Sequence, residues 1–168
     1  MATMTTMLAA LLVVALGGLQ HPSMPAGMSH EDHLKQMQKE ADLKRRGDAA
    51  MGFDQDKTTH RFQTRADGGA IEVDVKDPSD TASLAQVRAH LKEIAASFKS
   101  GDFAKPMETH AEVPPGVPAM QRLAGEIAYS YADTAKGGAV TIRTANTEAL
   151  AAVHEFLEYQ IREHHTAR

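Results

Sequence analysis

Hydrophobic and acidic residues alternate near the middle of the chain. Ile71, Val73 and Val75 fall on one side of an extended segment, and the residues between them are acidic. This alternation predicts a half-buried antiparallel strand. A second strand is predicted shortly before it, because Phe62 and Thr64 share one face of an extended segment.

Two later segments carry apolar residues at every third or fourth position, which predicts two amphipathic helices. The first helix is expected from about Ser83 to just before Gly101, and the second from Thr147 to about His165. The predicted buried stripes are Leu84, Val87, Leu91, Ile94 and Phe98 in the first helix, and Leu150, Val153, Leu157 and Ile161 in the second.

The same order of elements occurs twice. The string Gly-Gly-Ala-Ile-Glu-Val at 68–73 aligns with Gly-Gly-Ala-Val-Thr-Ile at 137–142, an offset of 69 residues as from Gly68 to Gly137. We therefore expect ββα repeats at about 60–100 and 129–165, with the glycines in the hairpin turns. The predicted fold is α+β: a two-layer sandwich built from a duplicated ββα unit, with a four-stranded antiparallel sheet, two main helices on one face and an additional N-terminal helix. The pattern leaves the strand order between the repeats open.

The N-terminal segment is different in character. Residues 7–19 form an uninterrupted apolar run that is short for a membrane span and typical of a signal peptide. Ala15 and Gly17 are small residues at the positions that a signal peptidase requires before Gly18. No Lys or Arg precedes the run, so an uncleaved anchor or a buried helix is the alternative. The interpretation is a signal peptide at 1–19 and a periplasmic or secreted mature protein.

The rest of the chain divides into two parts. Residues 20–50 are expected to form a flexible leader containing Met and His, followed by a polar helix that starts at Ser29 and stops at Gly47. Residues 51–168 are expected to form a single α+β domain. A proline-rich stretch at 103–118 interrupts the repeats, and a short helix should begin near Pro118.

Composition excludes several classes of function. The net charge is -4 with both signs interspersed, so the chain has no basic face for nucleic acid. It has no cysteine, which rules out disulfides, thiolate metal sites and cysteine nucleophiles. It also lacks the familiar nucleotide-binding and hydrolase motifs. We therefore expect a non-enzymatic protein, although histidines acting as acid and base remain an alternative.

Histidine and methionine supply the candidate chemistry. In the predicted N-terminal helix His30, His33 and Met37 lie on one face. Imidazole suits copper, nickel and zinc, and thioether sulfur selects for Cu(I). These three residues are the predicted metal site, with copper as the metal. The alternative is a solvated polar helix with a weak methionine anchor.

A second set of residues lies in or beside the predicted core. It comprises His60 in the first strand, His90 at the edge of a helix stripe, and Met107 and His110 in the proline-rich stretch. If that stretch folds over the sheet, these residues could form a cofactor pocket for copper or, alternatively, for haem. For each histidine a hydrogen-bonded structural role is the competing interpretation. The sequence further places His154 beside Glu158 on a helix surface, and His164 at an exposed, frayed end.

Two strings of the chain are also found together elsewhere. The chain resembles small exported bacterial proteins that carry Met-Gly-Phe-Asp-Gln-x-Lys-Thr, here 51–58, and Val-Pro-Pro-Gly-Val-Pro, here 113–118. The resemblance implies a bacterial exported protein and transfers no activity. The expected partner is a metal ion or a small ligand, with membrane contact only through an uncleaved signal segment. A haem or small-ligand module, or an interaction domain without a ligand, remains the alternative, and the oligomeric state is open.

Overall fold

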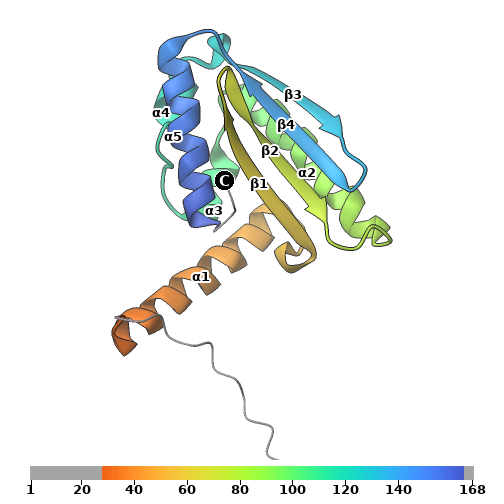
Figure 1. Ribbon diagram of the computed structural model, residues 1–168, viewed down its shortest axis with the longest axis vertical. Helices are drawn as coiled ribbons and strands as arrows, with labels where there is room; N and C mark the ends of the chain where they lie inside the picture. Colours follow the sequence, from red (N-terminus) through yellow and green to blue (C-terminus); the bar gives the residue numbers. More distant parts are fainter. Residues whose placement is uncertain (1–27, 165–168) are drawn as a thin grey trace, which may run out of the picture.

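A computed structural model describes residues 28–164 and contains one four-stranded antiparallel sheet (Figure 1). Its spatial order is β1-β2-β4-β3, so the second strand of each hairpin lies at the centre. The α+β class and the antiparallel sheet are thereby confirmed. The strands are β1 (Thr58–Arg65), β2 (Gly68–Val75), β3 (Ala128–Asp133) and β4 (Gly137–Arg143).

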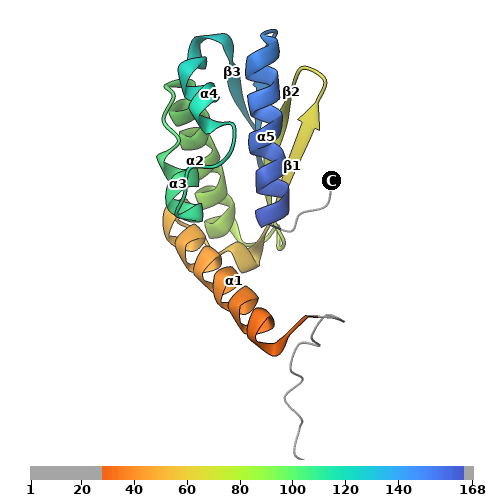
Figure 2. The ribbon, with the colours of Figure 1, turned by 90° about the vertical axis from the view of Figure 1, so that its left-hand side faces the viewer.

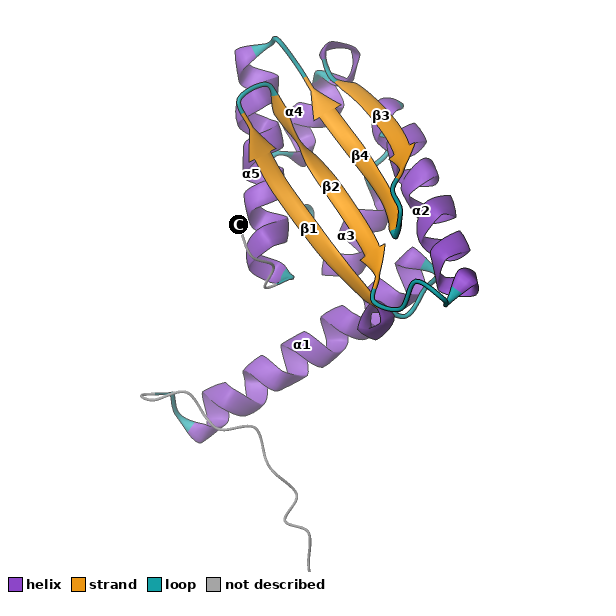
Figure 3. Ribbon diagram, turned by 45° about the vertical axis from the view of Figure 1, so that its right-hand side comes forward, coloured by secondary structure: helices purple, strands orange, loops and turns teal. Residues whose placement is uncertain are grey.

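Two long helices follow the two hairpins, α2 (Thr81–Lys99) and α5 (Thr147–Glu163). Asp80 begins α2 by accepting a hydrogen bond from the backbone N–H of Ser83 at 3.0 Å, and Asn146 caps α5 in the same way. Figure 3 shows the sheet in front of both helices. The packing is crossed, because α2 lies mainly on β3 and β4 while α5 lies on β1 and β2.

The core lies between the sheet and these helices. The alternating strand residues and most of the predicted helix stripes supply it, with Val140, Ile142 and Val153 fully buried. Leu84 and Leu150 of the predicted stripes are only half-buried. Aromatic rings close one end of the core, where Phe98 stacks on Phe103 with ring centroids 4.3 Å apart. Apolar burial is the main force that holds such a fold together.

The paired glycines do not form turns, so that prediction is wrong. The hairpin between β1 and β2 turns at residues 66–67, and Gly68 already pairs with Arg65. A Cβ on Gly68 would lie 2.1 Å from the carbonyl oxygen of Ile142, and one on Gly137 would lie 1.8 Å from that of Val73. The glycines are needed because β2 and β4 approach too closely for a side chain.

The N-terminal helix α1 (His30–Met51) is longer than predicted. Ser29 caps its start as expected, but the helix continues through Gly47 and ends at Gly52, whose φ is +73°. Gly47 is buried, and a Cβ there would lie 2.4 Å from the side-chain nitrogen of Gln55. Close packing therefore explains this glycine, and α1 extends away from the rest of the domain (Figures 1 and 2).

The proline-rich stretch is mostly helical. It contains α3 (Ala104–His110), which was not predicted, and α4 (Val117–Arg122), which begins beside Pro118 as expected. Short 3-10 turns lie at Gln55–Lys57 and Ala124–Glu126. Helix α3 is tied to α1, since Arg46 Nε donates to the carbonyl oxygen of Thr109 at 3.0 Å and Lys105 Nζ to that of Ala50 at 3.1 Å. No helix within 28–164 is both long and apolar enough to cross a bilayer.

Candidate functional site

A cavity of about 60 Å³ lies between the sheet, α2, α3 and the end of α5. Its walls are mainly apolar and include Phe62, Val73, Leu91, Phe98 and Phe156. Four histidines also line it: His60, His90, His110 and His164. We call this space the histidine cavity.

Three of the four residues predicted as a cofactor pocket meet in the histidine cavity. His60 lies two residues before Phe62 on β1 and therefore faces inward on the same side of the sheet. His90 lies on the inner face of α2 beside Leu91. His110 is carried to the cavity by α3. Met107 packs against the core but does not line the cavity, so the structure does not bring it together with the histidines.

His164 contacts two of these histidines, although the sequence indicated an exposed, frayed end. Its ring stacks on His60 with centroids 5.8 Å apart and an interplanar angle of 16°. It meets His110 edge to face at 5.2 Å. His164 is half-buried at the end of α5. The signal that could have indicated burial is its spacing of seven residues from Leu157, which puts both residues on the same face of the helix.

Buried polar atoms without a hydrogen-bond partner concentrate on this cavity. They are Nε2 of His60, Nδ1 of His90, Nδ1 of His110 and Nε2 of Gln160. An unsatisfied buried polar atom costs about 1–3 kcal/mol, so several in one cavity require a reason. The side-chain oxygen of Gln160 accepts a hydrogen bond of 2.9 Å from Nε2 of His110, which leaves Nδ1 of His110 with a free lone pair.

Three of the cavity histidines, His60, His90 and His110, are uncharged at neutral pH. Burial lowers the pKa of His60 from 6.5 to about 4. Burial is also the main cause that lowers the pKa of His90 to about 4, assisted by the positive charge of Lys105. Burial lowers the pKa of His110, although the hydrogen bond to Gln160 opposes this shift. A neutral imidazole is the form that binds a metal ion.

No three His, Asp or Glu side chains within residues 28–164 surround a common point as they stand. For His60 and His164 the stacking of the rings explains why they do not share a point. The lone pair of an imidazole nitrogen lies in the plane of its ring, and two nearly parallel planes do not converge on one ion. A single ion can be shared only if the rings turn. The site is therefore a cluster of four imidazoles, three of them neutral, around a small apolar space.

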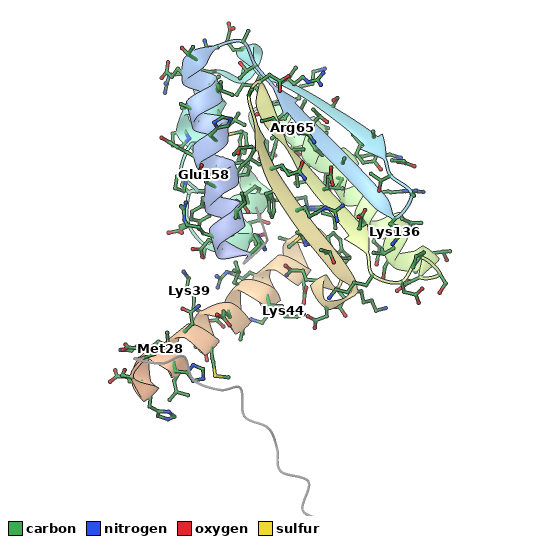
Figure 4. All side chains as sticks on the ribbon, viewed as in Figure 1. Met28, Lys39, Lys44, Arg65, Lys136 and Glu158 are labelled. Atoms are coloured by element: carbon green, nitrogen blue, oxygen red, sulfur yellow. The ribbon has the colours of Figure 1, made fainter. Side chains whose placement is uncertain are left out.

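The residues predicted as the metal site on α1 lie elsewhere. His30 is exposed, Met37 is 44% exposed, and neither lines the cavity. Figure 4 shows Met28 at the end of α1 that is remote from the sheet, the end at which the helix begins with His30. The structure keeps this set on one helix but does not join it to the histidine cavity.

His154 has a structural contact that the sequence did not reveal. Its Nε2 lies 2.9 Å from the carbonyl oxygen of Arg65 and 3.1 Å from that of Gly68. Because carbonyl oxygens only accept, this nitrogen carries the proton and fastens α5 to the first hairpin. Arg88 does the same from α2, donating to the carbonyl oxygens of Gly137 and Thr134 in the second hairpin.

A polar groove of about 460 Å³ adjoins the cavity. It runs between α1 and the end of α5, and His110 lines both spaces. Lys39 and Glu163 form an ion pair of 3.1 Å across this groove. The groove and the cavity therefore meet at His110.

No known protein family, curated protein or solved structure matches the chain. The class of protein is therefore defined by the molecule itself: an α+β domain that holds a small, histidine-lined cavity beneath its sheet.

Proposed function

We propose that this protein is a non-enzymatic metal-binding protein that holds one copper ion in the histidine cavity. The observation that carries the proposal is the set of buried imidazole nitrogens without partners in one cavity. A metal ion would use the lone pairs that the fold leaves unsatisfied. Because burial lowers the pKa values of His60 and His90 to about 4, protons would not compete with the metal near neutral pH.

Copper fits the lining better than other cations. No carboxylate lines the cavity, so calcium and magnesium would lack the oxygen ligands they require. Imidazole suits copper, nickel and zinc, and the thioether of Met51, which also lines the cavity, favours Cu(I). A monovalent ion is also easier to bury without a compensating charge than a divalent one.

The size of the cavity favours copper over the alternative ligands. A cavity of about 150 Å³ is needed to hold benzene, and sites for drug-sized ligands have about 300–1,000 Å³. A space of about 60 Å³ admits an ion or a molecule of a few atoms, but not haem. Haem ligation by His60, His90 or His110 would require α3 to move away. A Soret band on haem titration, lost in a His110→Phe variant, would support that alternative.

We further propose that His30, His33 and Met37 capture copper on the projecting end of α1. The exposure of His30 and Met37 supports capture rather than storage, because an ion bound there stays in contact with water. The proposed job of the whole protein is copper capture or buffering outside the cytoplasm. Export rests on the apolar segment 1–19, which lies outside the described residues; N-terminal sequencing of the protein after expression with its full leader would test it.

We also propose that the fold is a two-layer sandwich made from a duplicated ββα unit. Ile71 pairs directly with Val140, its equivalent at the offset of 69 residues, so the β2–β4 ladder is centred on equivalent positions. The glycine contacts are equivalent as well, since Gly69 lies against Leu157 and Gly138 against Leu91.

The test of the proposed function is a competition titration of the mature protein with Cu(I) and Cu(II). We expect one ion per chain in the histidine cavity, weakened in His60→Phe and His110→Phe variants. The matched control is His154→Gln, which removes an imidazole outside both proposed copper sites and keeps a side-chain donor for the carbonyl oxygens of Arg65 and Gly68. Copper affinity weaker than micromolar at the cavity would leave an interaction domain without a ligand as the better description.

A further inference from the structure

The central position in the histidine cavity belongs to His164. It is the only one of the four whose ring contacts two others, His60 from β1 and His110 from α3. It also lies against Phe62 at 5.4 Å. Three separate elements of the fold thus bring their imidazoles together at the end of α5.

We propose that His164 is a ligand of the metal site, and that with His60 and His110 it forms a three-imidazole set when the His60–His164 stack opens. The proposal rests on the proposed function. It adds a ligand that the sequence indicated to be exposed, and it identifies the conformational change that binding requires.

The spacing of two pairs of rings is close to that around a shared ion. A metal–nitrogen bond of about 2.0–2.1 Å puts a ring centroid about 3.2 Å from the ion, so two rings bound at tetrahedral to trigonal angles have centroids about 5.2–5.6 Å apart. The observed separation of His110 and His164, 5.2 Å, lies within this range, and that of His60 and His164, 5.8 Å, lies slightly beyond it. Binding one ion therefore requires the rings to turn and approach a common point, and side-chain rotation supplies such a change.

The other half of the molecule shows the same position without ligands. By the spacing of Leu91 and Leu157, the equivalent of His164 is Phe98, and at the offset of 69 residues the equivalent of His60 is Tyr129. Phe98 and Tyr129 are also in ring contact, at the same centroid distance of 5.8 Å. In the other half, Phe98 and Tyr129 thus fill the equivalent place in the core without any imidazole. Packing alone does not require histidines there, so His60 and His164 indicate a role beyond packing.

The position of His164 also gives an ion access. Its neighbour Glu163 and its contact partner His110 both line the groove between α1 and α5. An ion that enters from this groove meets His110 and His164 before it reaches His60. We therefore expect His164 to be the outermost ligand of the set.

The test compares wild type, His164→Phe and the control His154→Gln by Cu(I) competition titration. Mutating a residue that is hydrogen-bonded to a metal ligand typically weakens metal affinity about 10–100-fold. The loss of a direct ligand such as His164 should therefore weaken copper affinity at least about tenfold. Phenylalanine occupies the equivalent place at Phe98, so the variant should fold, and its circular dichroism verifies this. Copper affinity unchanged in His164→Phe would overturn the role of His164 alone, whereas no binding by wild type would overturn the proposed function as well.

A second measurement needs no substitution. Ring ¹⁵N signals of the histidines in the wild-type protein are followed while Cu(I) is added. The ring signals of His60, His110 and His164 should shift together at one equivalent of copper. A His164 ring that keeps its chemical shift while the other two change would contradict the proposal.

Discussion

Replacing His90 by phenylalanine should stabilise the protein while weakening its metal site. His90 is 9% exposed, and its Nδ1 has no hydrogen-bond partner. At the equivalent helical position of α5 the chain has Phe156, which is buried in the same core. The ring of His90 packs edge-on against Phe53 at 5.5 Å, a contact that phenylalanine can keep.

The magnitude follows from two contributions. Removing an unsatisfied buried polar atom relieves about 1–3 kcal/mol. The larger ring also extends into the adjacent cavity of about 60 Å³, and filling about half of it at about 24 cal/mol per Å³ adds roughly 0.7 kcal/mol. We expect a net gain of about 2 kcal/mol in the free energy of unfolding, which corresponds to a Tm about 4–8 °C higher.

The assay is thermal and urea unfolding of the metal-free variant, with His33→Phe as the control. The exposed control should stay within about 0.5 kcal/mol of wild type. A His90→Phe variant with a Tm below that of wild type would refute the reasoning, because it would mean that His90 satisfies its polar atoms in the folded protein.

Two further predictions concern the sheet and the pH dependence. Gly137→Ala should destabilise the protein by more than about 3 kcal/mol in urea unfolding, because its Cβ would overlap the Val73 carbonyl. The control is Gly125→Ala, whose Cβ would meet nothing within 4 Å and which should change stability by less than about 1 kcal/mol. Equal effects of the two substitutions would contradict the close approach of β2 and β4 as the reason for Gly137. Stability should fall as the pH drops from 6.5 toward 4, because burial lowers the pKa of His60 and His90 to about 4 and the unfolded chain then binds more protons. Each histidine contributes up to about 1.4 kcal/mol per pH unit, so the stability advantage of His90→Phe over wild type should grow in that range, and a constant advantage would contradict a neutral buried His90.

Local patterns in the sequence predicted the elements well, because those patterns record burial and capping directly. The alternation at Ile71, Val73 and Val75 gave a strand, and the stripe through Val87 and Leu91 gave a helix, as the structure confirms. The helix α3 was missed because Pro106 indicated a loop, whereas proline is tolerated in the first turn of a helix.

The glycines were misjudged for a reason that lies outside local sequence. A Gly-Gly pair between two strands is typical of a turn, but Gly137 is required by the distance between β2 and β4, and Gly68 by that distance as well as by its φ of +143°. That distance depends on which strands pair, and the sequence left the strand order open. Local rules cannot distinguish a glycine needed for φ from one needed for space.

The candidate site was predicted in part. His60, His90 and His110 were selected by residue type and by position near the apolar stripes, and they do line one cavity. Met107 belongs to the same stretch as His110 but faces a different part of the core. The role of His164 could not be anticipated, because adjacency between the ends of α5 and α3 arises only from the crossed packing of the helices.

The most direct test of the central claim is anomalous X-ray scattering at the copper edge from crystals of the copper-loaded mature protein. The account predicts one strong peak inside the histidine cavity, within about 2.0–2.1 Å of imidazole nitrogens from His60, His110 and His164. Copper found only at His30, His33 and Met37, or bound without any cavity imidazole, would contradict it.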